Sequence, residues 1–571
     1  MLTQRELMVI RVLYALMAAI VLLGLFVPVM EVDSAQYASI SKQMWQSGNF
    51  LHLFNRDLYY LDKPPLLFWI SSLSIGILGS TDFAFKLPNA LVSVLGVVSL
   101  FRFTRLYYTS RTAHYAALMY GFSTGFLLFN NDVRTDGLLI AFVIFSVYQL
   151  SKYRIYAKNL NFVLAFVGIA FAMMAKGPLG LIVVGMVLVP DALLKRDYKF
   201  IFHGKWLLGV LIIALLLFPM SYGLYTQFDA APEVSVNGEQ GVSGLKFFYW
   251  TQSFGRITGE STWAGAYSNN PATFYLVESF LWAFLPFTLI YLLSFFHCSG
   301  HLIKSRFRLA ANEEAISLFG VVLPLLALSQ SGYQLNHYAY IVLPFAAVSG
   351  AAYLNRIIPQ AKTLSLLFLA QALILILVLC IVIFLQTFVF KGAASMLVFF
   401  SLLLVVLALA FWFYQQFRFT SVITLSSLVA GFVFVMFNSY YFPYLLRFQP
   451  EKQLFLDKQA LEIPDTQFYH YQTGTYHALD FYSKHYVPIL QLWQLGSLAD
   501  TAASDLYLSV SDAGMQDILT LGLAVDTLKT YDYFPITELN LAFLNPESRT
   551  VQLKKRYLLK LPVRGNPKAK Q

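Results

Sequence analysis

Thirteen apolar stretches follow one another along this chain, and each is read as long enough to cross a hydrocarbon layer roughly 30 Å thick. Hydrophobic residues make up 58% of the 571 positions and charged residues only 12%, which leaves too few polar residues to cover a soluble globule. The sequence therefore predicts an α-helical polytopic membrane protein with about 13 transmembrane helices. The predicted spans lie at about residues 9–29, 83–103, 112–129, 137–151, 160–176, 178–194, 206–225, 272–296, 314–330, 338–355, 363–389, 394–414 and 420–443.

Two apolar stretches need separate treatment. The first span is longer than the apolar core of a typical secretory signal and has no convincing small-residue cleavage site, so we expect a retained helix. The stretch at 64–80 has an apolar core of only about 14 residues, which suits an interfacial or re-entrant segment better than a crossing. Counting it as a crossing would also invert every later loop.

Basic residues gather in every second connection between the predicted spans. The short connections in between hold only Arg134, Lys176 and Lys391. Because short cytoplasmic loops carry an excess of Lys and Arg, the N-terminus is predicted to be cytoplasmic. Thirteen crossings then place the C-terminal region outside, together with two longer outer loops at 31–82 and 226–271.

Hydropathy falls from about residue 444 onward. We expect a membrane domain at 1–443 and a soluble α/β domain at 444–571 on the periplasmic side. Within the latter, 466–472 and 505–512 alternate as strands do, and 497–503 and 512–522 are expected to be helices. The segment holds equal numbers of basic and acidic residues, so the net charge of +10 resides in the membrane portion, and nothing indicates nucleic-acid binding.

The unusual polar residues fall on the predicted outer face. Ionisable groups at the edge of the hydrocarbon layer are costly, and they are usually retained for handling ions or substrates. Their convergence is the strongest functional signal in the sequence. The residues concerned are Asp33, Asp62, Lys63, Asp132, Arg134, Asp136, Lys176, Arg256, Gln334, His337 and Tyr338.

Each of these residues also has a purely structural interpretation. Asp33 could cap a helix, and Asp62 and Lys63 could form a solvated pair that contributes only about 0 to 1 kcal/mol. Lys176 could be a helix-end lysine that extends its ammonium to the interface. Arg256 could anchor the chain at the interface, and His337 could be an ordinary interface histidine. No two histidines or acids have the spacing of a zinc site, so no metal ligands are predicted, although the acids are compatible with a divalent metal.

The stretch YYLDKPPLLFW (59–69) sets a charged pair and two prolines among aromatic residues. Aromatic side chains would anchor the segment at headgroup depth, the prolines would fix the backbone, and Lys63 would offer a compact charge to a phosphate. Residues 37–45 have helical apolar spacing and predict an amphipathic helix in the interface, with Asp33 at its start.

These motifs, taken in order, resemble those of the GT-C membrane glycosyltransferases, in particular the lipid A aminoarabinose transferases and the dolichyl-phosphate-mannose protein mannosyltransferases. None is decisive alone, but their order and shared side are fairly specific. The matching pieces are D-x-x-x-Y (Asp33 to Tyr37), Y-x-[DE]-K-P-P (Tyr60 to Pro65), R-x-D-G-L-L (Arg134 to Leu139), A-K-G-P (Ala175 to Pro178), the lone Arg256, and Q-L-x-H-Y (Gln334 to Tyr338).

The resemblance implies an inverting transfer of a sugar from a polyprenyl phosphate to a lipid, glycan or protein acceptor, on the periplasmic face of a bacterial inner membrane. Asp33 would be the catalytic base or would orient the acceptor, with Asp136 as its companion. Lys63 would bind the donor phosphate. The remaining implied residues are Asp62, Tyr60, Arg256 and Tyr338 on the donor side, and Arg134, Lys176, Gln334 and His337 in support.

The sequence departs from the aminoarabinose transferases at two motifs. Ser34 and Gln36 stand where that family has Glu and Arg, and the K-L-P-x-Y motif becomes QLNHY, which removes a lysine and a proline. These changes leave the sugar and the acceptor open. Two other functions also stay open: a transporter or flippase of lipid-linked sugars, and a non-catalytic scaffold. Transporters, however, tend to place polar residues near the bilayer midplane.

Overall fold

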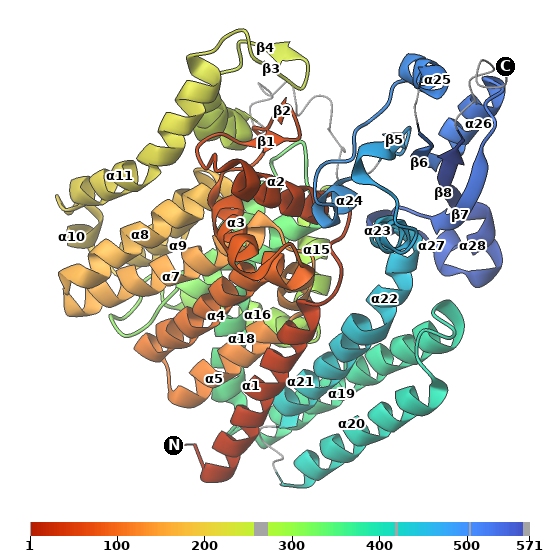
Figure 1. Cartoon of the computed structure of the whole chain (residues 1–571). Coiled ribbons are helices and arrows are strands. Elements are labelled where there is room, and N and C mark those ends of the chain that lie inside the picture. The colour runs from red at the N-terminus through yellow and green to blue at the C-terminus, as the bar shows by residue number, and fades with distance from the viewer. Residues whose placement is uncertain (1, 256–271, 417–420, 475, 502–503, 563–571) are drawn as a thin grey trace, which may run out of the picture.

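The computed structural model describes residues 2–255, 272–416, 421–474, 476–501 and 504–562. Helices form a large bundle, and the C-terminal segment packs against one end of it (Figure 1). Within the described residues, eight helices are long and apolar enough to cross a membrane. They are Gln4–Gly24, Asp82–Tyr107, Thr135–Tyr156, Asn159–Lys176, Tyr198–Asp229, Asn336–Ile357, Ala361–Val389 and Val422–Phe448.

A ninth span is present if helices α15 (Tyr275–Ala283) and α16 (Thr288–Lys304) cross the membrane together. They meet at 119°, at Pro286, whose missing N–H and ring clash oppose a continuous helix. Three predicted spans correspond to shorter apolar helices: α9 (Leu179–Leu194), α17 (Ile316–Leu328) and α20 (Met396–Gln416). The multi-pass helical architecture is confirmed, and the number thirteen stays a prediction.

The single helix predicted at 112–129 is wrong. The structure has two helices there, α5 (Ser110–Gly121) and α6 (Thr124–Asn131), with extended backbone at Ser123. The backbone N–H of Thr124 donates to the carbonyl of Leu285 at 3.0 Å, and its hydroxyl donates to the same oxygen at 3.2 Å. A tertiary contact therefore satisfies the backbone where the helix is interrupted.

Helix α7 (Thr135–Tyr156) lies in the middle of the bundle, packed against α4 (Asp82–Tyr107), α8 (Asn159–Lys176) and α9. Most of its side chains are buried all round, as expected of a helix enclosed by other helices. Its two ends therefore hold fixed positions at opposite ends of the bundle.

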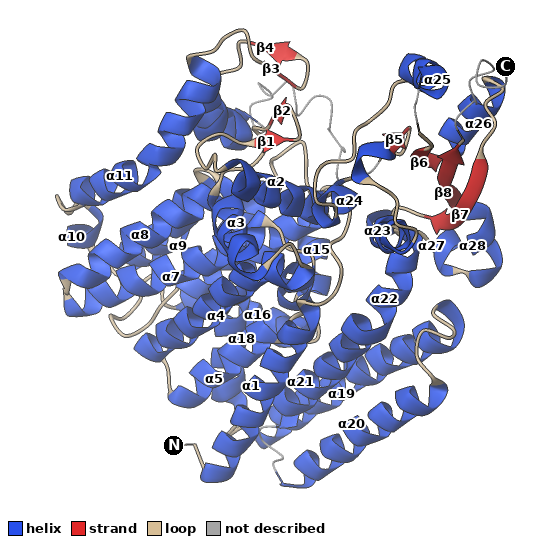
Figure 2. Ribbon diagram, viewed as in Figure 1, coloured by secondary structure: helices blue, strands red, loops and turns tan. Residues whose placement is uncertain are grey.

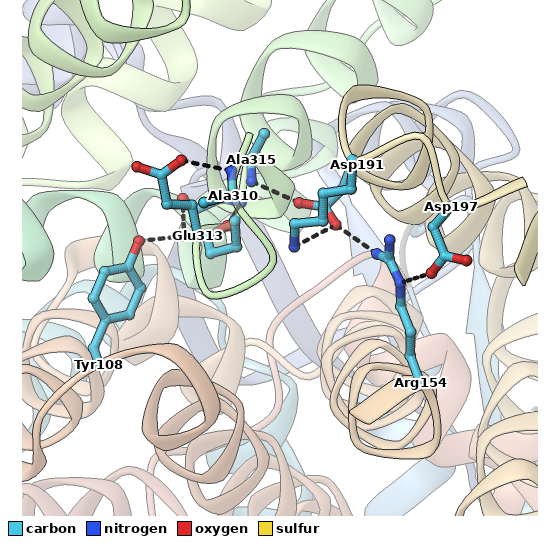
Figure 3. Close-up of polar contacts among 10 residues, drawn as sticks. Tyr108, Arg154, Asp191, Asp197, Ala310, Glu313 and Ala315 are labelled. Atoms are coloured by element: carbon cyan, nitrogen blue, oxygen red, sulfur yellow. Dashed lines mark hydrogen bonds and ion pairs between the residues drawn. The ribbon is translucent and has the colours of Figure 1, made fainter. Parts of the chain in front are cut away.

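The C-terminal end of α7 is held by a buried ionic cluster (Figure 3). Arg154 contacts Asp191 and Asp197, each at 2.7 Å. The Asp191 carboxylate, which is 0% exposed, also accepts the backbone N–H of Ala315 at 2.8 Å and lies 3.0 Å from the Lys195 ammonium. Every charge here has a partner, so the cluster fastens the 305–315 connection to the bundle.

The segment at 31–82, predicted to be the first outer loop, begins with α2 (Asp33–Ser47), continues through a short hairpin, β1 (Phe54–Asn55) and β2 (Leu58–Tyr59), and ends in α3 (Leu66–Leu78) and the start of α4. The helix predicted at 37–45 is thus present and begins at Asp33. Its side chains are largely covered by α3 and by α24 (His477–Tyr482) of the C-terminal segment, so protein, as well as any interface, surrounds it.

The C-terminal segment contains a four-stranded sheet in the order β5-β6-β8-β7, drawn red in Figure 2. Strands β5 and β6 are parallel, and the other two pairs are antiparallel. Both predicted strands correspond to β5 and β6, and both predicted helices to α25 and α26. That this segment is a separate soluble domain outside the membrane stays a prediction. The elements are α23 (Glu451–Ala460), β5 (Phe468–Tyr471), α24, α25 (Leu492–Thr501), β6 (Leu506–Ser511), α26 (Asp512–Thr520), β7 (Asp526–Tyr533), α27 (Leu541–Leu544), α28 (Pro546–Gln552) and β8 (Lys554–Leu561).

Candidate active site

Four helix ends bring the predicted polar residues together at the end of α7 opposite the Arg154 cluster. Asp33 is the first residue of α2, and Asp136 lies in the first turn of α7. Carboxylates are favoured at these positions by the partial positive charge of a helix N-terminus. Lys176 is the last residue of α8, and His337 lies in the 3₁₀ helix Asn336–Val342.

Lys176 owes its position to the glycine that follows it. Gly177 has φ +68°, a conformation that favours glycine, and it ends α8 directly after the lysine. Pro178 then opens α9. The AKGP motif is therefore a helix end that fixes an ammonium group beside the start of α7.

The Arg134 side chain lies close to three other side chains of the site. Its guanidinium contacts Asp33 at 2.5 Å and Asp132 at 2.9 Å, and its Nη1 lies 3.5 Å from Nδ1 of His337. The Asp33 side chain is 40% exposed, whereas Arg134 is largely covered. One carboxylate therefore remains accessible while the cation that orients it is fixed.

Asp136 is enclosed. Its carboxylate is 7% exposed and lies 2.5 Å from the Lys176 ammonium and 3.7 Å from Nε2 of His337. The same ammonium sits 4.1 Å above the centre of the Tyr338 ring. Asp33, Arg134, His337, Asp136 and Lys176 thus form one continuous polar chain, in which the two acids have very different access to solvent.

The Lys-Pro-Pro segment lies beside this chain. Lys63 is half-buried, it has no ion pair with any described residue, and its charge acts electrostatically on His337. Asp62 acts likewise on Tyr37 and Tyr60, and its carbonyl accepts a hydrogen bond from Gln252.

The Tyr60 ring is fixed by an edge-on contact with Phe68, 5.7 Å between centroids, and Tyr37 packs on the same ring at 5.8 Å. The Tyr60 hydroxyl is buried and has no hydrogen-bond partner among the described residues. Buried hydroxyls normally find one. Among the described residues, the Lys63 ammonium has no ion pair and the Tyr60 hydroxyl has no hydrogen-bond partner, and an incoming anion requires such uncommitted groups.

Two predicted residues, Gln334 and Arg256, remain to be placed. Gln334 is buried and donates to the carbonyls of Ser329 and Ser331 at 2.9 and 3.0 Å, so it shapes the turn before His337. Arg256 lies outside the described residues. From the sequence, no role is expected for Tyr37, which ends the D-x-x-x-Y motif, or for Asp132, which is named only among the polar residues of the predicted outer face. Among the described residues, no group of three or more His, Cys, Asp or Glu side chains could hold a metal ion.

The chain is similar in sequence and in fold to known glycosyltransferases. The profile of the dolichyl-phosphate-mannose-protein mannosyltransferase family matches residues 62–222. The crystal structure of ArnT from Cupriavidus metallidurans bound to undecaprenyl phosphate superposes with a TM-score of 0.72, covering 97% of this chain and 98% of that one at 16% identity.

The chain has the ArnT fold. The apo structure of the same protein gives the same TM-score. The undecaprenyl phosphate-alpha-4-amino-4-deoxy-L-arabinose arabinosyl transferase 2 of Proteus mirabilis is 24% identical over 253 residues, which is 43% of this chain and 42% of that protein. The corresponding transferase of Pseudomonas paraeruginosa is 25% identical over 355 residues, covering 60% of this chain and 58% of that one.

The expected resemblance to the GT-C glycosyltransferases is confirmed by these comparisons. The region that matches the Proteus mirabilis relative covers less than half of that protein's length. The mannosyltransferase profile includes Asp62, Lys63, Arg134, Asp136 and Lys176 but not Asp33 or His337. The structure therefore adds two residues to those that the profile covers. They are Asp33, the first residue of α2, and His337, and both lie close to Arg134.

Proposed function

We propose that this chain is a membrane glycosyltransferase that moves a sugar from a polyprenyl phosphate to an acceptor. One observation carries the proposal. The same end of an ArnT-fold bundle holds an accessible carboxylate, Asp33, and an ammonium, Lys63, that has no ion pair with any described residue. A base and an anion-binding group are the two functions that such a transfer requires.

In the proposed reaction, Lys63 and the Tyr60 hydroxyl bind the donor phosphate, with Asp62 and Tyr338 as the other described donor-side residues. The acceptor oxygen attacks the anomeric carbon from the face opposite the phosphate. The bond from that carbon to the phosphate oxygen breaks, and the configuration inverts. Lys63 stabilises the charge that develops on the leaving phosphate, and Asp33 takes the proton of a hydroxyl acceptor.

Arg134 orients Asp33, and the enclosed Asp136 holds His337 and Lys176 in place rather than meeting the substrate. The proposed setting is a bacterial inner membrane, with the N-terminus cytoplasmic and the C-terminal segment and the site on the periplasmic side. The basic inner connections support this orientation. The acceptor is a lipid, a glycan or a protein of the envelope.

The test is transfer of a radiolabelled sugar from undecaprenyl phosphate to membrane extract by the purified full chain. We expect labelled product with the wild type and far less with Asp33→Asn or Lys63→Ala. Asp197→Asn, which changes an acid at the other end of α7, is the matched control and should retain activity. Equal product from Asp33→Asn and wild type would refute the site, and accumulation of labelled lipid in sealed vesicles without bond formation would indicate a flippase.

A further inference from the structure

The backbone that leads into Asp33 is held by the far end of the chain. Gln449 accepts the backbone N–H of Glu31 at 2.8 Å and donates to the carbonyl of Val29 at 3.0 Å. The backbone N–H of Ala478 donates to the Glu31 carboxylate at 2.6 Å. The start of α24 therefore lies beside the residues immediately before Asp33.

Helix α24 is fastened to the first outer loop by a buried ion pair. Asp480 accepts two hydrogen bonds from the Arg56 guanidinium, at 2.7 and 2.8 Å, and its side chain is fully buried. Lys42 of α2 donates to the carbonyls of Asp480 and Ser483. Such two-point pairing fixes orientation as well as distance. The residue before Ala478 is thereby fixed against α2.

That residue is His477. It is 7% exposed, and its Nδ1 is buried with no hydrogen-bond partner among the described residues. Leaving a buried polar atom unpaired costs about 1 to 3 kcal/mol, so such atoms are rare. Burial, assisted by the positive charge of Arg56 and opposed by the negative charge of Asp33, lowers the pKa of His477 to about 4, so the imidazole is neutral near pH 7.

The contacts of α24 place His477 on the side of the site where α2 begins. Ala478, the residue after His477, donates to Glu31, two residues before Asp33. The cations that contact α24 are already engaged among the described residues: Arg56 pairs with Asp480, and the Lys42 ammonium donates to two carbonyls.

Building on the proposed function, we propose that His477 is an acceptor-binding residue contributed by the C-terminal segment, and that it binds a hydroxyl of a saccharide acceptor headgroup beside Asp33. A neutral imidazole offers one hydrogen-bond donor and one acceptor, which matches a hydroxyl. A phosphate acceptor would need an uncommitted cation, whereas Arg56 is paired with Asp480 and Lys42 donates to the carbonyls of Asp480 and Ser483. The acceptor hydroxyl then attacks the anomeric carbon while Asp33 takes its proton, and the donor phosphate leaves.

The experiment uses the full chain with undecaprenyl-phosphate-linked radiolabelled sugar at saturation and a titrated membrane lipid extract. His477→Ala should raise the apparent KM for the extract about tenfold, the loss expected from one hydrogen bond of about 1.4 kcal/mol. Binding of undecaprenyl phosphate should not change. His485→Ala, an exposed histidine on the same segment, is the matched control, and His477→Gln, which retains a donor and an acceptor, should recover part of the loss.

The product supplies the second measurement. A sugar joined to a hydroxyl survives mild acid, whereas a sugar joined to a phosphate is released. Acid-stable label together with the raised KM supports the inference. Acid-labile label, an unchanged KM in folded His477→Ala, or an equal loss of undecaprenyl phosphate binding overturns it while leaving the transferase proposal intact. No transfer by the wild type overturns the proposed function, and this inference with it.

Discussion

The two ends of α7 carry ionic clusters that differ in one respect. At the Arg154 end, the Asp191 carboxylate is wholly buried and contacts Arg154, Lys195 and a backbone N–H. At the Asp136 end, a similarly buried acid is paired, but the cluster continues outward to Asp33, which is 40% exposed. Closed clusters hold helices together, whereas a cluster with an accessible acid and a neighbouring Lys63 can bind and react. Substitutions should therefore affect stability at one end and turnover at the other.

The largest expected effect is at Asp33. Asp33→Asn should lower the rate of transfer by roughly 10² to 10⁴, the usual contribution of a general base, because the amide cannot take a proton. Thermal unfolding in detergent should change little, since the side chain is partly exposed. A loss of stability as large as that expected for Arg154→Met would mean that the two ends of α7 do not differ in this respect.

Arg154→Met should destabilise the protein by about 1.5 to 3 kcal/mol, because it removes a charged hydrogen bond from the fully buried Asp191, which keeps Lys195 and a backbone N–H as partners. Thermal unfolding of the purified protein measures this loss. Turnover per folded molecule should stay near the wild-type value. A fall in turnover with normal stability would assign the Arg154 end a part in the reaction.

Lys63→Ala should weaken binding of undecaprenyl phosphate by roughly 10- to 100-fold, the equivalent of a charged hydrogen bond of about 1.5 to 3 kcal/mol. Stability should be unaffected, because no ion pair with a described residue is lost. Equilibrium binding of the labelled lipid is the measurement, and Lys304→Ala at the opposite end of the bundle is the control. Equal weakening by both variants would point to a general charge effect.

The smallest expected effect is the pH dependence due to His477. Its folded pKa of about 4 is below the usual 6.5, so the unfolded chain binds more protons as the pH falls from 6.5 to 4. Stability present above pH 6.5 is therefore lost over that window, by about 2 kcal/mol at pH 5. Unfolding curves of His477→Gln should lack this part of the slope. An identical slope in the variant would show that the ring is accessible to protons in the folded state.

Part of this organisation could be predicted from the sequence. The spans, the gathering of basic residues in every second connection, and the shared face of Asp33, Asp136 and Lys176 follow from hydropathy and charge, because a bilayer imposes both. The break between α5 and α6 could not, since it depends on the carbonyl of Leu285, far along the chain. Neither could the contact of Gln449 with Val29 and Glu31, because nothing in an isolated glutamine indicates a partner more than 400 residues away.

Within the site, the family resemblance implied that Asp33 is the base and Asp136 its companion, but nothing in the sequence provided a physical reason for that difference. Asp33 and Asp136 both stand at the start of a helix in a polar motif. Their difference arises from Lys176 and His337, which enclose one carboxylate and leave the other open. Enclosure is a property of packing between segments, so only the folded arrangement distinguishes an anchoring acid from an available one.

Arg134 forms ion pairs with two carboxylates, those of Asp33 and Asp132. If Asp33 swings toward an incoming molecule, the guanidinium keeps its second counterion and does not drift into the vacated space. The Asp33 carboxylate can thus exchange partners during each catalytic cycle while Asp132 keeps Arg134 neutralised and in place.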